Sequence, residues 1–89
     1  MYPVNIIDDK LFLTNGEPIV CYDLKIGIAS TKCQNIHSEK VYIIIGSCNV
    51  IDKAFEKGVY FILQSSDLNL WLLTEKGFEF KFKKIEPDC

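Results

Sequence analysis

The residues that could bind a metal ion or act as nucleophiles are a single histidine and four cysteines: His37, Cys21, Cys33, Cys48 and Cys89. Structural zinc sites normally use close pairs, such as two cysteines separated by two residues, and the sequence contains no such pair. Cys21 and Cys48 lie in or beside apolar segments, where a free cysteine is an ordinary small core residue. We therefore predict reduced thiols, no metal site and no cofactor.

Acid–base catalysis by an imidazole would depend on His37, because it is the only histidine in the sequence. A cysteine–histidine mechanism also needs contact between the two side chains and a third group that orients them. His37 lies in a polar segment, residues 30–39, which has no periodicity and predicts a loop. We predict that the protein is not an enzyme, and an enzyme or ligand carrier that uses His37 remains an alternative.

Paired carboxylates are the other common acid–base arrangement, and the sequence offers two pairs. Asp8 and Asp9 are adjacent between two apolar segments, which is typical of a turn. Asp52 and Glu56 are each followed by a lysine, as on the hydrated face of a helix. A catalytic pair needs a cleft that shifts a pKa, and neither pair indicates one.

The basic residues bear on nucleic acid as a partner. The chain has a net charge of −2, and its ten basic residues are all lysines, whereas bidentate recognition of phosphates and bases favours arginine. Lys81, Lys83 and Lys84 are interleaved with phenylalanines, which can form a platform for single-stranded nucleic acid. In a strand, however, Phe78, Phe80 and Phe82 would face the core and the lysines would face solvent. Nucleic-acid binding through these lysines is therefore kept only as an alternative.

The first third of the sequence has the pattern of a hairpin followed by a long strand. Asn15-Gly16 separates two apolar segments and favours the positive φ angles of a type I′ turn. Apolar residues then alternate and are predicted to share one face of a strand with one wet face: Val20, Tyr22, Leu24, Ile26 and Ile28. Gly27 predicts a bulge or a bend in that strand.

Three later segments are apolar on both faces, as strands buried on both sides are. These segments cover residues 41–45, 59–64 and 68–74, and a last strand over 78–83 follows a hairpin loop at 75–77. Between the first two, residues 49–57 have helical spacing, with Asn49 as the N-cap and Gly58 as the C-terminal signal. The pattern predicts one helix of two turns.

One short helix cannot cover the second face of three strands, so the sheet must curl or meet another chain. We predict a single β-rich domain over residues 1–89, mainly β in class (all-β or α+β). The expected architecture is a small antiparallel, partly closed barrel or sandwich of six to seven short strands, with the helix near residues 49–57.

The sequence also bears on the compartment. Its start lacks the basic and apolar regions of a secretory signal, and no apolar segment is long enough to span a membrane. These features predict a cytoplasmic protein without a membrane partner, which agrees with free thiols.

The predicted function follows from sparse chemistry and abundant apolar residues, which make up 48% of the chain. We predict a non-enzymatic protein-interaction module, either a homodimer or an inhibitor, immunity or adaptor-type protein, that binds another chain through an apolar sheet face. Tryptophan is enriched among interface hot spots, so the sole tryptophan is the expected centre. The predicted interface residues are Trp71, Asn69, Leu73, Tyr60 and Tyr42. The alternative is that Trp71 closes a barrel core.

Overall fold

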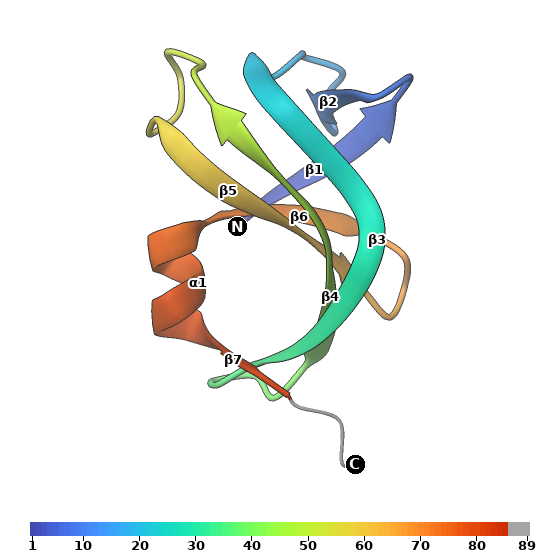
Figure 1. Cartoon of the computed structure of the whole chain (residues 1–89), viewed down its shortest axis with the longest axis vertical. Helices are drawn as coiled ribbons and strands as arrows, with labels where there is room; N and C mark the ends of the chain where they lie inside the picture. Colours follow the sequence, from blue (N-terminus) through green and yellow to red (C-terminus); the bar gives the residue numbers. More distant parts are fainter. Residues whose placement is uncertain (86–89) are drawn as a thin grey trace.

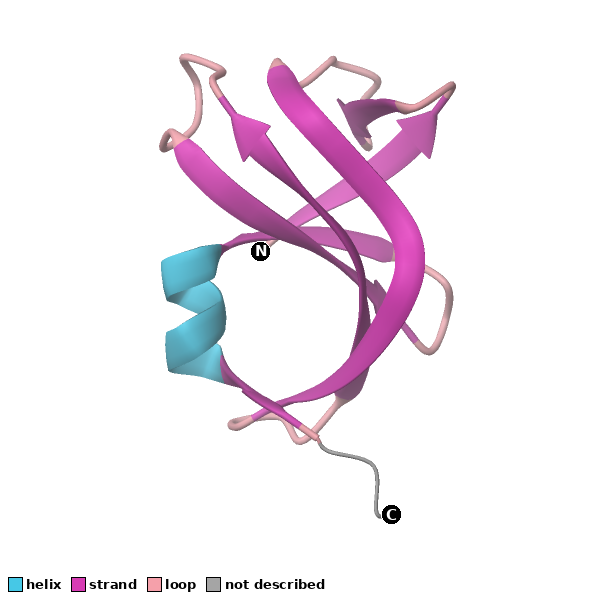
Figure 2. Cartoon of the chain, viewed as in Figure 1, coloured by secondary structure: helices cyan, strands magenta, loops and turns pink. Residues whose placement is uncertain are grey.

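The computed structural model describes residues 1–85, and it describes the side chains of all of these except residues 28–30. Seven strands form one sheet in the order β2-β1-β6-β5-β4-β3-β7, with every pair of neighbours antiparallel (Figure 1). The strands are β1 (Tyr2–Ile7), β2 (Lys10–Leu13), β3 (Cys21–Asn35), β4 (Val41–Val50), β5 (Gly58–Ser65), β6 (Leu70–Thr74) and β7 (Phe82–Lys84). A short helix, α1 (Glu75–Lys81), connects β6 to β7 (Figure 2). The prediction of a mainly β, antiparallel fold is confirmed.

The sheet curls into a partly closed barrel, in agreement with the sequence. The segment before β3 lies beside β2, where the N–H of Ile19 donates to the carbonyl of Leu11 over 3.0 Å. Two residues later the chain enters β3, and Cys21 pairs with Val50 of β4. The chain thus passes from one end of the ladder toward the other, although the ladder itself stays open between β2 and β7.

The side chains of the sheet are divided between two cores. The first lies inside the barrel and contains Val4, Leu11, Ile19, Cys48, Val50, Tyr60, Ile62 and Leu72. The second lies against α1 and β7 and contains Cys33, Tyr42, Leu63, Leu73, Phe78 and Phe82. β5 and β6 contribute to both, because neighbouring residues such as Ile62 and Leu63 point to opposite faces. This confirms the predicted strands that are apolar on both sides.

The prediction of a helix over residues 49–57 is wrong. β4 continues through Val50, which is fully buried and pairs with Cys21 on one side and Gly58 on the other. The residues that follow form a loop, and the carboxylate of Asp52 accepts hydrogen bonds from two backbone N–H groups. Pairing on both edges and burial of Val50 outweigh a weak local preference for helix.

The helix α1 occurs where the sequence predicts a hairpin loop and a strand. The hydroxyl of Thr74 accepts a hydrogen bond from the N–H of Gly77 over 3.0 Å and caps the first turn. The rings of Phe78 and Phe82 then stack in the second core with centroids 5.4 Å apart. Phe80 points away and is 79% exposed, so the expectation that it faces the core is wrong. Across the described residues, no helix has the length and apolar character of a membrane span.

The sequence predicts a loop over residues 30–39, but β3 continues to Asn35 and the turn covers only residues 36–40. Cys33 is buried in the second core and pairs with Tyr42 of β4 and Lys84 of β7. This polar segment is a strand because both of its edges are paired, which local pattern does not reveal. Gly27 has a φ of +91° beside a shift of register, which confirms the predicted bend.

The type I′ geometry occurs at Asp8-Asp9 instead of Asn15-Gly16. Asp8 and Asp9 have φ angles of +51° and +60° and connect β1 to β2 by a two-residue hairpin, so the turn predicted there is confirmed. At the other hairpin only Gly16 has a positive φ, of +92°, and the loop contains residues 14–16. The sequence therefore locates both hairpins but assigns the wrong turn type to the second.

Replacing Asp8-Asp9 by Asn-Gly should raise the free energy of unfolding by about 0.5–1 kcal/mol. Asn-Gly is the preferred type I′ sequence, and glycine adopts a positive φ without the steric cost that other residues carry. Urea denaturation of the double variant measures the gain. A variant with asparagine at both positions removes the same charges without glycine, and equal stability of the two variants would contradict the steric explanation.

Candidate interaction surface

The five predicted interface residues do not lie on one surface. Tyr42 and Leu73 are buried in the second core, and Tyr60 is buried in the first. Trp71 is half-buried against the second core, and Asn69 is exposed in the turn before β6. In the isolated chain, three of the five side chains therefore have little surface to offer a partner.

Trp71 packs at the rim of the second core. Its indole Nε1 donates to the hydroxyl of Ser65 over 3.4 Å, and Ser65 also bonds to Asp67 within the turn between β5 and β6. The hollow beside the indole is lined by Ser65, Ser66 and Asp67 of that turn, and by Lys40, Val41 and Tyr42. The exposed part of Trp71 thus borders a polar turn and a hollow of mixed polar and apolar lining.

His37 lies in the turn between β3 and β4 and is exposed. The side-chain oxygen of Asn35 accepts hydrogen bonds from the backbone N–H groups of His37 and Ser38, at 2.9 and 3.0 Å. Among the described residues, no three His, Cys, Asp or Glu side chains gather closely enough to hold a metal ion. This arrangement does not strengthen the alternative of an enzyme or ligand carrier that uses His37.

Three of the cysteines, Cys21, Cys33 and Cys48, are free thiols, and Cys89 lies outside the described residues. Burial raises the pKa of Cys33 to about 11. Burial, together with the neighbouring Cys21, raises the pKa of Cys48 to about 12. Burial also raises the pKa of Cys21, which contact with Cys48 partly offsets. These thiols are poor nucleophiles near neutral pH, because the thiolate is the reactive form.

Cys33 and Cys48 should therefore resist alkylation in the folded protein. At pH 8 only about a thousandth or less of either thiol is ionised, so iodoacetamide should modify both at least 100-fold more slowly than in the urea-denatured chain. Peptide mapping by mass spectrometry measures both rates in one sample. Equal alkylation of native and denatured protein would show that the thiols are accessible.

The same raised pKa values predict a dependence of stability on pH. The free energy of unfolding should fall as pH rises from about 9 toward 12, since the unfolded chain loses the protons of Cys33 and Cys48 first.

The three lysines of the nucleic-acid alternative lie at the C-terminal end of the described chain. Lys81 ends α1, and Lys83 and Lys84 are neighbours on β7, so the last two point to opposite sides of the strand. Phe78 and Phe82 are buried in the second core, whereas Phe80, next to Lys81 in the sequence, is 79% exposed. One exposed ring is less than the series of rings on which successive bases stack. Nucleic-acid binding through these lysines stays a prediction that this geometry does not strengthen.

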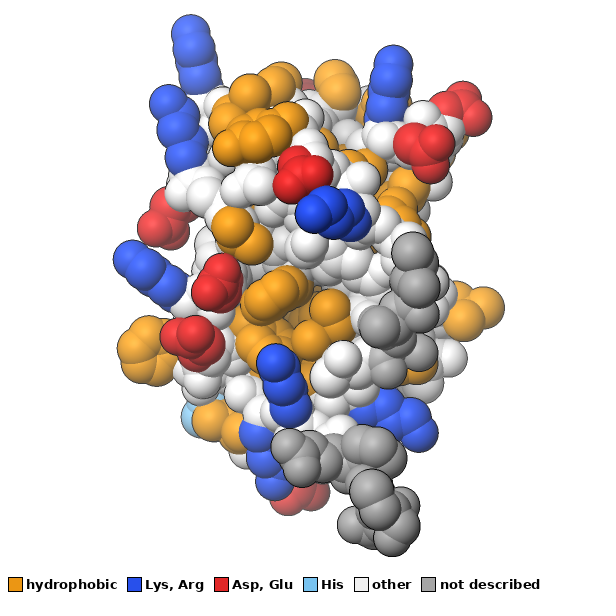
Figure 3. Space-filling model, viewed as in Figure 1, with side chains coloured by type: hydrophobic (Ala, Val, Ile, Leu, Met, Phe, Trp, Pro, Cys, Tyr) orange, Lys and Arg blue, Asp and Glu red, His pale blue; other side chains and the backbone are white. Residues whose placement is uncertain are grey.

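A depression lined by apolar side chains lies over β3, β4 and β5, and we call it the β3–β5 hollow. It has a volume of about 340 Å³, and Ile26, Ile44, Ile45 and Phe61 supply its apolar lining. Gly46 is also part of the lining, and its lack of a side chain lets the backbone of β3 at Lys25 and Ile26 approach β4 closely. Figure 3 shows apolar side chains gathered in a depression near the middle of this face, between charged side chains.

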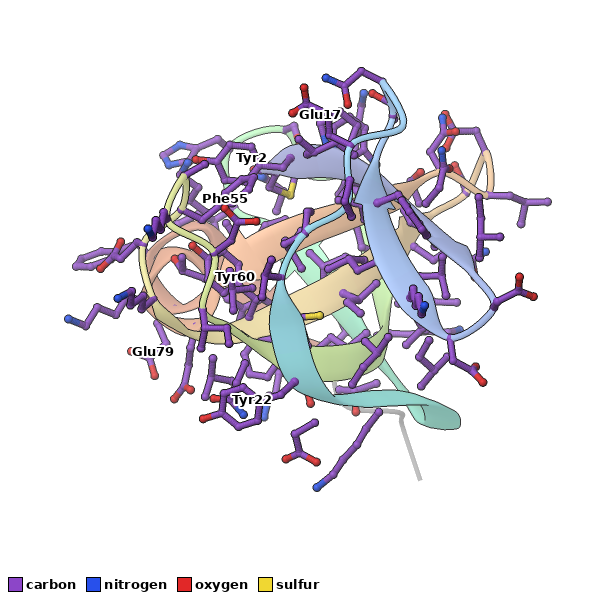
Figure 4. The ribbon with its side chains drawn as sticks, turned by 90° about the horizontal axis from the view of Figure 1, so that it is seen from above. Tyr2, Glu17, Tyr22, Phe55, Tyr60 and Glu79 are labelled. Atoms are coloured by element: carbon purple, nitrogen blue, oxygen red, sulfur yellow. The ribbon has the colours of Figure 1, made fainter. Side chains whose placement is uncertain are left out.

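Tyr22 stands on the same face as this hollow. It pairs with Asn49 of β4, and Asn49 pairs with Val59 of β5, so the three side chains form a row across the outer face. Two residues along β4 and β5, the next row contains Ser47 and Phe61, which line the hollow. Tyr22 is 57% exposed and points away from the barrel (Figure 4).

The sequence does not reveal this surface, because a bulge reverses the alternation that was expected to bury Tyr22. Asp23 has a φ of +55°, and the β3–β4 register shifts between Tyr22 and Lys25. Leu24 packs against the first core, whereas Val20 and Tyr22 are exposed. The prediction that these residues share one face is therefore wrong. The only signal of the hollow in the sequence is the pair of glycines, Gly27 and Gly46, within strands.

Comparison with known proteins yields no match: no family model, no curated protein and no solved structure is significantly similar to this chain.

Proposed function

We propose that this chain is a non-enzymatic protein-interaction module that binds another protein through the outer face of β3, β4 and β5. The observation that supports the proposal most is the β3–β5 hollow, about 340 Å³ of apolar-lined space open to solvent beside Tyr22. Exposed apolar patches with a polar rim are typical of contact sites for other proteins. The proposal includes the reducing cytoplasm as the compartment, which the free thiols of Cys21, Cys33 and Cys48 support.

The exposed apolar residues beside the hollow would supply much of the binding free energy. Tyr22, Val59 and Ile26 are 57%, 40% and 39% exposed. Burial of apolar surface contributes about 25 cal/mol per Å², and a central aromatic residue of an interface commonly contributes about 2 kcal/mol or more. Tyr22 is therefore the expected hot spot, in place of the buried residues around Trp71.

A charged side chain in the hollow should abolish partner binding. Tagged wild-type chain and an Ile26→Asp variant are used to capture proteins from an extract of cells that express the chain naturally, and retained proteins are quantified by mass spectrometry. We expect at least one protein, either this chain or another, to be retained stoichiometrically by wild type and at least tenfold less by Ile26→Asp, because an unpaired buried carboxylate is costly.

Leu68→Asp is the matched control, since Leu68 is exposed in a turn away from the hollow lining and gains the same charge. It should retain the same protein as wild type. Circular dichroism checks that both variants are folded. Identical capture by wild type, Leu68→Asp and a folded Ile26→Asp would refute the proposed surface.

A further inference from the structure

We infer that the occupant of the β3–β5 hollow is a second copy of this chain, in a two-fold dimer in which Tyr22 of each copy enters the hollow of the other. The inference rests on the proposed function and identifies its partner. It is carried by the order of side chains along β3: an exposed ring, then two opposite charges, then an apolar hollow.

The spacing of these features suits a two-fold axis. The row of Tyr22, Asn49 and Val59 lies two residues, or about 7 Å, from the row of Ser47 and Phe61 along β4 and β5. The hollow begins at that second row. An axis that passes through the face between the tyrosine and the hollow exchanges their positions, so each copy supplies a protruding ring where the other has space.

The charges between the ring and the hollow are also self-complementary. Asp23 and Lys25 form an exposed ion pair with 3.7 Å between Oδ2 and Nζ. Rotation by 180° about an axis between them brings Asp23 of one copy opposite Lys25 of the other, and the reverse. A two-fold contact requires such a self-complementary patch, because each surface meets itself. A contact that paired like charges would be opposed by their repulsion.

Association through the free edge of β3 is the competing geometry, and the structure disfavours it. β7 pairs with β3 only at Cys33–Asn35, which leaves the edge before that point unpaired in the described ladder. Positive φ angles at Asp23 and Gly27, each beside a shift of register, break that edge into short pieces. Bulges of this kind protect edge strands against pairing with another chain. The face of the sheet is therefore the available surface.

The small size of this face limits the affinity that we expect for the dimer. In the view of Figure 1 the molecule measures 39 by 24 Å, and an interface of standard size, about 800 Å² per partner, would need nearly all of this face. Tyr22 and the hollow cover only part of this face. We expect a reversible dimer with a Kd in the range of about 1–100 µM.

Sedimentation velocity from about 1 µM to 1 mM should show a monomer–dimer equilibrium for wild type. Tyr22→Ala should raise the Kd at least tenfold, whereas Phe80→Ala should leave it unchanged, because Phe80 is an even more exposed aromatic residue that does not line the hollow. Lys25→Glu and Asp23→Lys should each be monomeric through repulsion across the axis. An equimolar mixture of these two variants should dimerise again, because every cross-axis pair is then opposite in charge.

A wild type that is monomeric at 1 mM, or a dimer unaffected by Tyr22→Ala and Lys25→Glu, would overturn the inference. Asp23 has a positive φ, so Asp23→Lys can be unstable, and the other two variants carry the test without it. If the wild type is monomeric, the capture experiment with Ile26→Asp decides whether the same face binds a different protein. If the wild-type chain then captures no protein, the proposed function is refuted as well.

Discussion

Replacing Gly46 with alanine should lower the free energy of unfolding by about 2–4 kcal/mol, a large change for the addition of one methyl group. A Cβ at this position would lie 2.2 Å from the carbonyl oxygen of Lys25 and 3.2 Å from the Cα of Ile26. Both are backbone atoms of the paired strand β3, so they cannot rotate away. Relief would require β3 and β4 to separate where the β4–β5 register also shifts.

Urea denaturation measures the loss for Gly46→Ala, with Ser47→Ala as the control. Ser47 is the next residue of β4, and its side chain lines the open hollow, so its truncation should change stability by no more than about 0.5 kcal/mol. Similar stability of the two variants would mean that the close approach of β3 and β4 at Gly46 is not needed for folding.

Tyr60→Ala should destabilise the protein by about 3–5 kcal/mol, because the ring is 1% exposed in the first core and its removal leaves a cavity. The hydroxyl of Tyr60 donates to the carbonyl of Glu56 over 2.6 Å, which ties the loop before β5 to the barrel. Tyr60→Phe separates the two contributions. It keeps the ring and should lose only about 1 kcal/mol, the usual net value of one hydrogen bond.

The two Tyr60 variants are compared by chemical denaturation at the same pH. Equal losses for Tyr60→Ala and Tyr60→Phe would mean that the hydroxyl, and not the buried ring, dominates. A small loss for Tyr60→Ala would contradict the burial of this ring in the first core, which is what removes Tyr60 from the sequence-predicted interface.

The strands that bury both faces could be predicted from sequence because their signal is local. Residues 41–45 and 59–64 are apolar at nearly every position, and this matches strands β4 and β5 in the middle of the sheet. The short helix could not be placed, because the alternation of Phe78, Phe80 and Phe82 predicts a strand. The helix of seven residues is stabilised by the Thr74 cap and by the packing of two of the three rings, which the residue pattern does not reveal.

The candidate surface was less accessible to prediction than the fold. Tyr22 and Leu24 lie on opposite faces because Asp23, between them, adopts a positive φ where the register shifts. A bulge leaves no clear signal in the residue pattern, yet it shifts the alternation, so that the side chains after it change faces. The sequence wrongly favours a surface position for Tyr42 and Tyr60 for a related reason: the pattern marks both faces of their strands as apolar but does not say what covers each face.

The sharing of β5 and β6 between the two cores limits how the molecule can come apart. Removal of α1 and β7 would bare the outer side of the same strands that line the barrel, and loss of β1 would bare their inner side. Neither of the two cores is complete without β5 and β6. Hydrogen exchange at the amides of β5 should therefore require opening of the whole molecule, and the chain should unfold as one cooperative unit that cannot be divided into smaller autonomous pieces.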